Sequence, residues 1–243
     1  MKDNISLLDL LKSGAHFGHK TSRWNPKMKP FIFTVRNNIH IIDLEKTRSG
    51  VQKAADFAAD TAKTGGVILF VGTKRQSRDI VKQQAENCGM PYVNLRWLGG
   101  TFTNFRTIQK TVRKLEKLQT RMAAPDFEQK YTKKERLLTE REIEKLTKLF
   151  EGIKNMKRTP QAVFIADIHH DHIALTEARA MKVPVIAIVD TNTDPSLVDY
   201  PIPANDDATA AVALITTVIS ETIAANKVAS APTVPTVEEA AVE

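Results

Sequence analysis

Uninterrupted apolar runs alternate with amphipathic stretches along most of this chain. The apolar runs at residues 67–71, 162–166 and 183–189 predict strands covered on both faces, and residues 92–93 predict a short strand. Helical spacing of apolar positions predicts helices at residues 5–12, 43–63, 73–87, 172–181 and 207–225. Because strands and helices alternate, we predict an α/β fold with a parallel sheet between helical layers, a three-layer arrangement.

Turn and capping residues mark the ends of several of these elements. Asn37 and Asn38 separate two apolar runs at 31–35 and 39–42, which predicts a β-hairpin. Asp43 is placed to cap the following helix, and residues 73–76 have the pattern of a capping box. Residues 205–207 are expected to cap the last helix. Residues 13–30 are too polar and too interrupted for regular structure.

Residues 103–158 break the strand–helix alternation. Apolar positions at residues 105–122 and 143–156 follow spacings of three and four, with a break at 123–126 and a second capping box at 132–135. Narrow apolar stripes with charged flanks predict an antiparallel helical hairpin, a coiled coil inserted as an arm. The expected organisation is one α/β domain of residues 1–102 and 159–226, the arm at 103–158, and a disordered acidic tail at 227–243.

The charge is divided very unevenly along the chain. Residues 1–158 hold 32 Lys and Arg against 16 Asp and Glu, whereas residues 159–243 hold 3 against 12. Residues 1–102 and 103–158 each carry 16 bases and 8 acids, so two separate basic surfaces are expected. Such a field favours a polyanionic partner, nucleic acid first, although solvated helix faces are the alternative. Residues 159–243, which carry the acidic excess, are expected to face away from the polyanion.

Composition excludes several classes of protein. The single cysteine, Cys88, cannot form an intramolecular disulfide, fits a reducing compartment, and is expected to be a buried small apolar side chain. We find no apolar run near the ~20 residues that cross a bilayer and no signal peptide, so we predict a cytoplasmic protein without a membrane partner.

Two segments combine basic and aromatic side chains as RNA-binding surfaces do. The first holds His16, His19, Lys20, Arg23, Trp24, Lys27 and Lys29, with Arg36 in the hairpin, and the second holds Arg96 and Trp97. For each tryptophan a core position is the alternative. Lys74 and Arg75 follow a strand at a predicted helix start, where a phosphate of an RNA backbone could bind.

Metal binding and catalysis have little support in the sequence. His169, His170 and His172 lie near several aspartates, which leaves a metal site open beside surface and capping roles. No catalytic motif is present, so we predict no enzyme, no cofactor and no metal. The alternatives are a nucleotide- or metal-dependent α/β enzyme and an adaptor whose arm binds a partner helix.

Ordered motifs over residues 5–225 closely resemble bacterial small-subunit ribosomal protein two. They are LKSGAHFGH at 11–19, WNPKMKP at 24–30, IHIIDL at 39–44, FVGTK at 70–74, RWLGGT at 96–101, GIKNM at 152–156, DTN at 190–192 and IPANDD at 202–207. The resemblance implies a flavodoxin-like sheet and a structural role that supports assembly and translation. It also implies binding to 16S-type rRNA near the head–body junction, contacts with other small-subunit proteins, and help in anchoring ribosomal protein one. By position it adds Arg106, Lys110, Arg113 and Lys114 of the arm to the RNA-binding residues.

Overall fold

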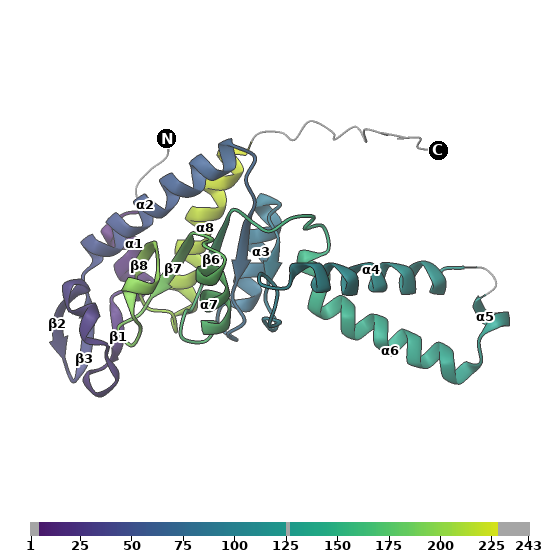
Figure 1. Cartoon of the computed structure of the whole chain (residues 1–243). Helices are drawn as coiled ribbons and strands as arrows, with labels where there is room; N and C mark the ends of the chain where they lie inside the picture. The colour runs from purple at the N-terminus through teal and green to yellow at the C-terminus, as the bar shows by residue number, and fades with distance from the viewer. Residues whose placement is uncertain (1–4, 125–126, 228–243) are drawn as a thin grey trace.

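A computed structural model describes residues 5–124 and 127–227 (Figure 1). The helices are α1 (Leu7–Lys12), α2 (Leu44–Lys63), α3 (Arg78–Cys88), α4 (Phe105–Met122), α5 (Phe127–Lys130), α6 (Lys133–Phe150), α7 (His172–Ala180) and α8 (Thr209–Asn226). The strands are β1 (Phe17–Lys20), β2 (Ile32–Arg36), β3 (Ile39–Ile42), β4 (Ile68–Val71), β5 (Tyr92–Val93), β6 (Ala162–Ile165), β7 (Val185–Val189) and β8 (Tyr200–Pro203). Short 3₁₀ turns are η1 (Thr21–Arg23), η2 (Pro26–Phe31), η3 (Glu151–Ile153) and η4 (Pro195–Leu197).

The central sheet is parallel and has the order β5-β4-β6-β7-β8, which confirms the predicted α/β class. Numbered by appearance within this sheet, the strands run 2-1-3-4-5, an order found in doubly wound folds. The sequence did not predict β8, because Pro201 and Pro203 argue against a strand. At the edge of a sheet a missing backbone N–H leaves no neighbouring strand unpaired, so both prolines are tolerated there.

Apolar side chains alternate between the two faces of this sheet and meet helices on both. On one face Ile68, Phe70 and Phe164 pack with residues of α2, α3 and α8. On the other face Leu69 and Val163 pack with α7 and with the base of the arm. Figure 1 shows α7 on the side opposite to α8. Successive side chains of a strand point to opposite faces of the sheet. Because these strands are apolar at every position, both faces are covered by helices.

A second sheet is antiparallel and has the order β1-β3-β2. The predicted hairpin is confirmed, since Asn37 and Asn38 have φ of 50° and 61° in its turn. The prediction that residues 13–30 lack regular structure was wrong in part, because β1, η1 and η2 lie there. Strand β1 was missed because its order depends on distant pairing with β3 and not on local alternation.

The predicted helix starts were right at some positions and wrong at others. Asp43 accepts from the Glu45 N–H, and Thr132 with Glu135 forms a full capping box. The box predicted at 73–76 was wrong, because α3 begins at Arg78. Helix α8 begins at Thr209, so residues 205–207 lie before it. Only the Asn205 side chain acts as a turn cap there, by accepting from the N–H groups of residues 207 and 208.

Helices α4 and α6 pack against each other and extend away from the sheet (Figure 1). Ile108, Val112 and Leu115 of α4 face Ile143 of α6, and these side chains are part of the same apolar cluster as one face of the sheet. The apolar contact between α4 and α6 is therefore continuous with the core, and this fixes the base of the helical pair on the sheet.

Helix α8 is, among the described residues, the one helix long and apolar enough to cross a membrane. It packs against α2 and α3 instead, with Val212, Ile215 and Ile219 fully buried, so it is a core helix. Cys88 is buried as predicted, and burial raises the pKa of its thiol to about 11. The tail prediction lies outside the described residues except for Lys227, whose Nζ donates to the carbonyls of Cys88 and Gly89.

Candidate nucleic-acid interface

Exposed cations gather on the segment from β1 to β2. We call Lys20, Arg23, Lys27, Lys29 and Arg36 the first basic surface, and each of these residues is exposed. Lys27 differs from the others, because its Nζ lies 2.6 Å from a carboxylate oxygen of Asp194 and 3.0 Å from the Ser196 hydroxyl. The remaining four cations form no ion pair with any described residue, so their charge is available to an external anion.

A close backbone approach fixes this segment on the central sheet. The His19 N–H donates to the Thr191 hydroxyl at 2.8 Å, and the Asn25 N–H donates to the Thr191 carbonyl at 2.7 Å. A Cβ atom at Gly18 would lie 2.6 Å from the Thr191 side chain, a distance that real contacts do not reach. Gly18 is therefore required for β1 to lie against the loop that follows β7.

Three carboxylates, of which Asp167 and Asp206 are buried and Asp207 is exposed, lie beside this surface. The Lys74 ammonium lies 2.9 Å from Asp167, 2.8 Å from Asp206 and 2.7 Å from Asp207, and we call these four residues the Lys74 cluster. These contacts bear on two predictions, that Lys74 binds a phosphate and that the acidic part of the chain faces away from the polyanion. Lys74 is engaged by three carboxylates and is not free for a phosphate. The acidic part of the chain contacts the basic segment, because the loops after the parallel strands all lie at one edge of the sheet.

His19 joins the same region through its ring. Its Nδ1 lies 3.1 Å from a carboxylate oxygen of Asp190, and this carboxylate raises the pKa of His19 despite partial burial. Asp207 lies 3.7 Å from the other ring nitrogen. The ring is thus directed towards carboxylates inside the protein, so His19 positions the segment and presents little surface to RNA.

The titration of the Lys74 cluster follows from its burial. Burial and the neighbouring Asp167 and Asp190 raise the pKa of Asp206 to about 7. Burial alone would lower the pKa of Lys74, but the hydrogen bonds that its ammonium donates to Asp206 and Asp207 raise it overall. Lys74 therefore stays charged beside these carboxylates, and its ammonium lowers the pKa of the exposed Asp207.

Glu177 of α7 organises the second predicted segment, and the sequence did not reveal it. Its carboxylate accepts from Trp97 Nε1 at 3.2 Å, from the Gly100 N–H at 2.7 Å and from the Phe102 N–H at 3.0 Å. These donors lower the pKa of Glu177 against the effect of burial. The one available signal was an acidic residue on the apolar side of a predicted core helix.

The placement of Trp97 favours the core position that was the alternative to an RNA contact. The ring is only 7% exposed and packs edge-on against Phe102 at a centroid distance of 5.1 Å. No face is open for a base, so Trp97 has the core role that was its alternative. Trp24 is half-buried, with its ring 4.9 Å from that of His40, and Arg96 is exposed.

Helix α4 carries a second row of cations beside its apolar seam. Arg106, Lys110, Arg113 and Lys114, which we call the second basic surface, are all exposed. Their spacing places them along one side of the helix. Lys114 forms an ion pair with Glu142 of α6, so it also connects the two helices. Arg106, Lys110 and Arg113 form no ion pair with the described part of the chain.

The remaining residues that the sequence singled out differ in how far they are exposed. His16 is half-buried with its ring 4.0 Å from that of Phe17, and burial lowers its pKa. Arg75 is exposed. His169 and His170 are exposed, and their N–H groups donate to Asp167, as in the capping role. Over residues 5–124 and 127–227 no three His, Cys, Asp or Glu side chains are grouped as a metal site requires.

Comparison with known proteins identifies the family. The family profile described as ribosomal protein S2 matches residues 10–226. The small ribosomal subunit protein uS2 of Nocardia farcinica is 50% identical over 220 residues, covering 90% of this chain and 77% of that protein. The protein of the same name from Corynebacterium jeikeium is 49% identical over 227 residues, covering 93% and 82%. The profile covers most of the chain and about half of the aligned residues are identical to those of these relatives, so this chain belongs to the ribosomal protein S2 family of the small ribosomal subunit.

Proposed function

We propose that this chain binds 16S-type rRNA through the first and second basic surfaces, as a structural constituent of the small subunit. The observation that supports this is the set of exposed cations without an internal carboxylate partner: Lys20, Arg23, Lys29, Arg36, Arg106, Lys110 and Arg113. Lysine and arginine at such positions bind phosphates, which fix a protein on RNA without reading its sequence.

The two surfaces belong to different parts of the fold, and this favours contact with two separate regions of RNA. The first lies on β1, β2 and the turns between them, and the second lies on α4 (Figure 1). A rigid body that holds two RNA regions at a fixed distance would stabilise their arrangement. This is the physical basis on which we propose a role in subunit assembly and in translation.

Finer features of the proposal rest on the family resemblance. We place the binding site near the head–body junction, propose contacts with other small-subunit proteins including ribosomal protein one, and propose a cytoplasmic location. We likewise propose a flavodoxin-like classification for the sheet and a coiled coil for α4 and α6. The division into one α/β domain of residues 1–102 and 159–226, with an arm at 103–158, is part of the same proposal.

The dependence of binding on salt tests the proposed phosphate contacts. If most of the seven exposed cations each neutralise a phosphate, log affinity should fall against log salt concentration with a slope of about −3 to −5. The measurement is the affinity of the full chain for small subunits that lack this protein, at several KCl concentrations. A slope near zero would show that the contacts are not with phosphates and would contradict the proposal.

A further inference from the structure

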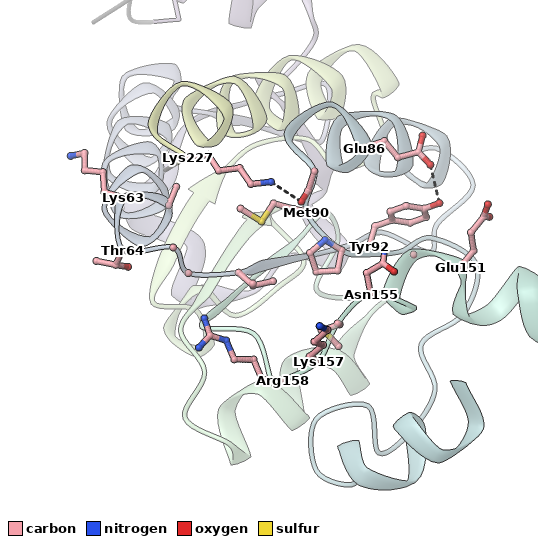
Figure 2. A pocket seen from close by; sticks show the side chains of 18 residues that line it. Lys63, Thr64, Glu86, Met90, Tyr92, Glu151, Asn155, Lys157, Arg158 and Lys227 are labelled. Carbon is pink, nitrogen blue, oxygen red and sulfur yellow. Dashed lines mark hydrogen bonds between the residues drawn. The ribbon is translucent and has the colours of Figure 1, made fainter. Parts of the chain in front are cut away.

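A large open groove lies at the amino ends of β4 and β5, away from the Lys74 cluster. It has a volume of about 1110 Å³ and is enclosed by the ends of α2 and α3, residues 89–92 and residues 151–158. Figure 2 shows Met90, Tyr92 and Lys157 among its lining residues. None of the contacts of the first or second basic surface involves this groove.

The groove has an apolar floor and a basic rim. Met90, Tyr92 and Met156 supply apolar surface, while Lys157 and Arg158 are exposed at the rim. Neither of these two cations forms an ion pair with any described residue. Glu86 and Glu151 also lie at the rim, and Lys82, which lies 3.8 Å from the first and 3.5 Å from the second, offsets one of these two charges. The three cations Lys157, Arg158 and Lys227 outnumber the one acidic charge that remains. The unbalanced charge of the groove is therefore positive, and it suits an acidic segment with small apolar side chains.

The end of the described chain forms part of the same groove. Lys227 lines it and is fixed there, because its Nζ donates to the carbonyl oxygen of Gly89 at 3.0 Å (Figure 2) and to that of Cys88 at 3.1 Å. Lys227, the last residue that the structure describes, thus lies at the groove wall. Residues 228–243 contain Glu238, Glu239 and Glu243, no lysine or arginine, and otherwise Ala, Val, Pro, Thr and Ser.

We propose that residues 228–243 of this chain bind in the groove. The glutamates would lie near Lys157 and Arg158, and the Val, Ala and Pro side chains would cover Met90 and Tyr92. Sixteen residues reach at most about 55 Å when extended, so length does not limit the contact. A tether that starts at the groove wall gives an effective concentration of about 1 mM, so even a weak intrinsic affinity is sufficient. Pro232 and Pro235 reduce the conformational freedom that binding must remove.

Paramagnetic broadening in the full chain tests this proposal. A nitroxide on Asn155→Cys would stand in the groove, and one on Lys46→Cys would stand at the far end of α2, about 25 Å from Lys63. Cys88 stays unlabelled because it is buried and burial raises the pKa of its thiol to about 11. We expect the amide signals of residues 236–243 to lose at least about half their intensity with the first label and to change little with the second.

Charge reversal provides the matched control. Lys157→Glu with Arg158→Glu should abolish the broadening, as should Glu238→Lys with Glu239→Lys, and combining all four changes should restore it. Equal broadening from both labels, or broadening that survives each reversal, would overturn the proposal. Broadening seen only after labelled and unlabelled molecules are mixed would also overturn it, because the tail would then reach a second copy.

Discussion

Replacing Lys74 with methionine is expected to lower the free energy of unfolding by about 3–5 kcal/mol at pH 8. The substitution keeps the length of the side chain but removes the one cation that touches Asp167, Asp206 and Asp207. Asp167 and Asp206 are buried, so they would remain as uncompensated charges in a region of low polarity. Chemical denaturation of the full chain, followed by circular dichroism, measures the change.

The loss should become smaller as the pH falls from 8 to 5. The pKa of Asp206 is already raised to about 7 by burial and by its acidic neighbours, and removal of Lys74 raises it further. In this range the folded state binds more protons than the unfolded state, so lower pH favours the folded variant. Asp206→Asn in the Lys74→Met background should recover part of the stability for the same reason.

Lys148→Met is the matched control for Lys74→Met. Lys148 also pairs with a carboxylate, that of Glu144, but both side chains are 63% exposed. Such an exposed pair on a helix surface contributes little to stability, so the control should unfold almost as the unmodified chain does. Equal losses for the two variants would mean that burial does not make the Lys74 cluster important for stability.

Reversing three exposed cations should weaken binding to small subunits by about 100-fold or more at physiological salt. The changes are Lys29→Glu, Arg36→Glu and Arg113→Glu, which affect both basic surfaces. Lys27 is left unchanged because it pairs with Asp194, so its loss would disturb the loop after β7. The measurement is competition between the variant and the unmodified chain for subunits that lack this protein.

The control must change the net charge by the same amount elsewhere. Arg48→Glu, Lys53→Glu and Arg179→Glu alter exposed residues of α2 and α7, outside both basic surfaces. This variant should compete almost as well as the unmodified chain. If it fails to the same extent as the first variant, net charge alone governs binding and the two surfaces have no special role.

The periodicity of the sequence predicted the elements that depend on local pattern. Apolar runs identified β4, β6 and β7 because strands buried on both faces need apolar residues at every position. Strand β1 was missed because its order depends on pairing with β3 and not on local alternation. Pro201 and Pro203 argue against a strand locally and are tolerated only because β8 lies at the edge.

The sequence predicted which residue types make up the candidate site but not which residues contact one another. Counting charge indicated the basic segments, and the structure exposes most of their cations. Counting could not show that Lys74 and His19 are turned towards Asp206 and Asp190, because those partners are more than a hundred residues away in the sequence. Trp97 and Glu177 illustrate the same limit, since their hydrogen bond joins residues 80 positions apart.

Site-directed crosslinking on assembled small subunits tests the central claim most directly. A photoreactive amino acid would replace Arg36 on the first basic surface, Arg113 on the second, and Ile173 as an exposed position on α7. Binding of rRNA through both surfaces predicts adducts with 16S-type rRNA from positions 36 and 113 and none from position 173. Adducts with protein alone from positions 36 and 113 would contradict the account and favour a protein adaptor.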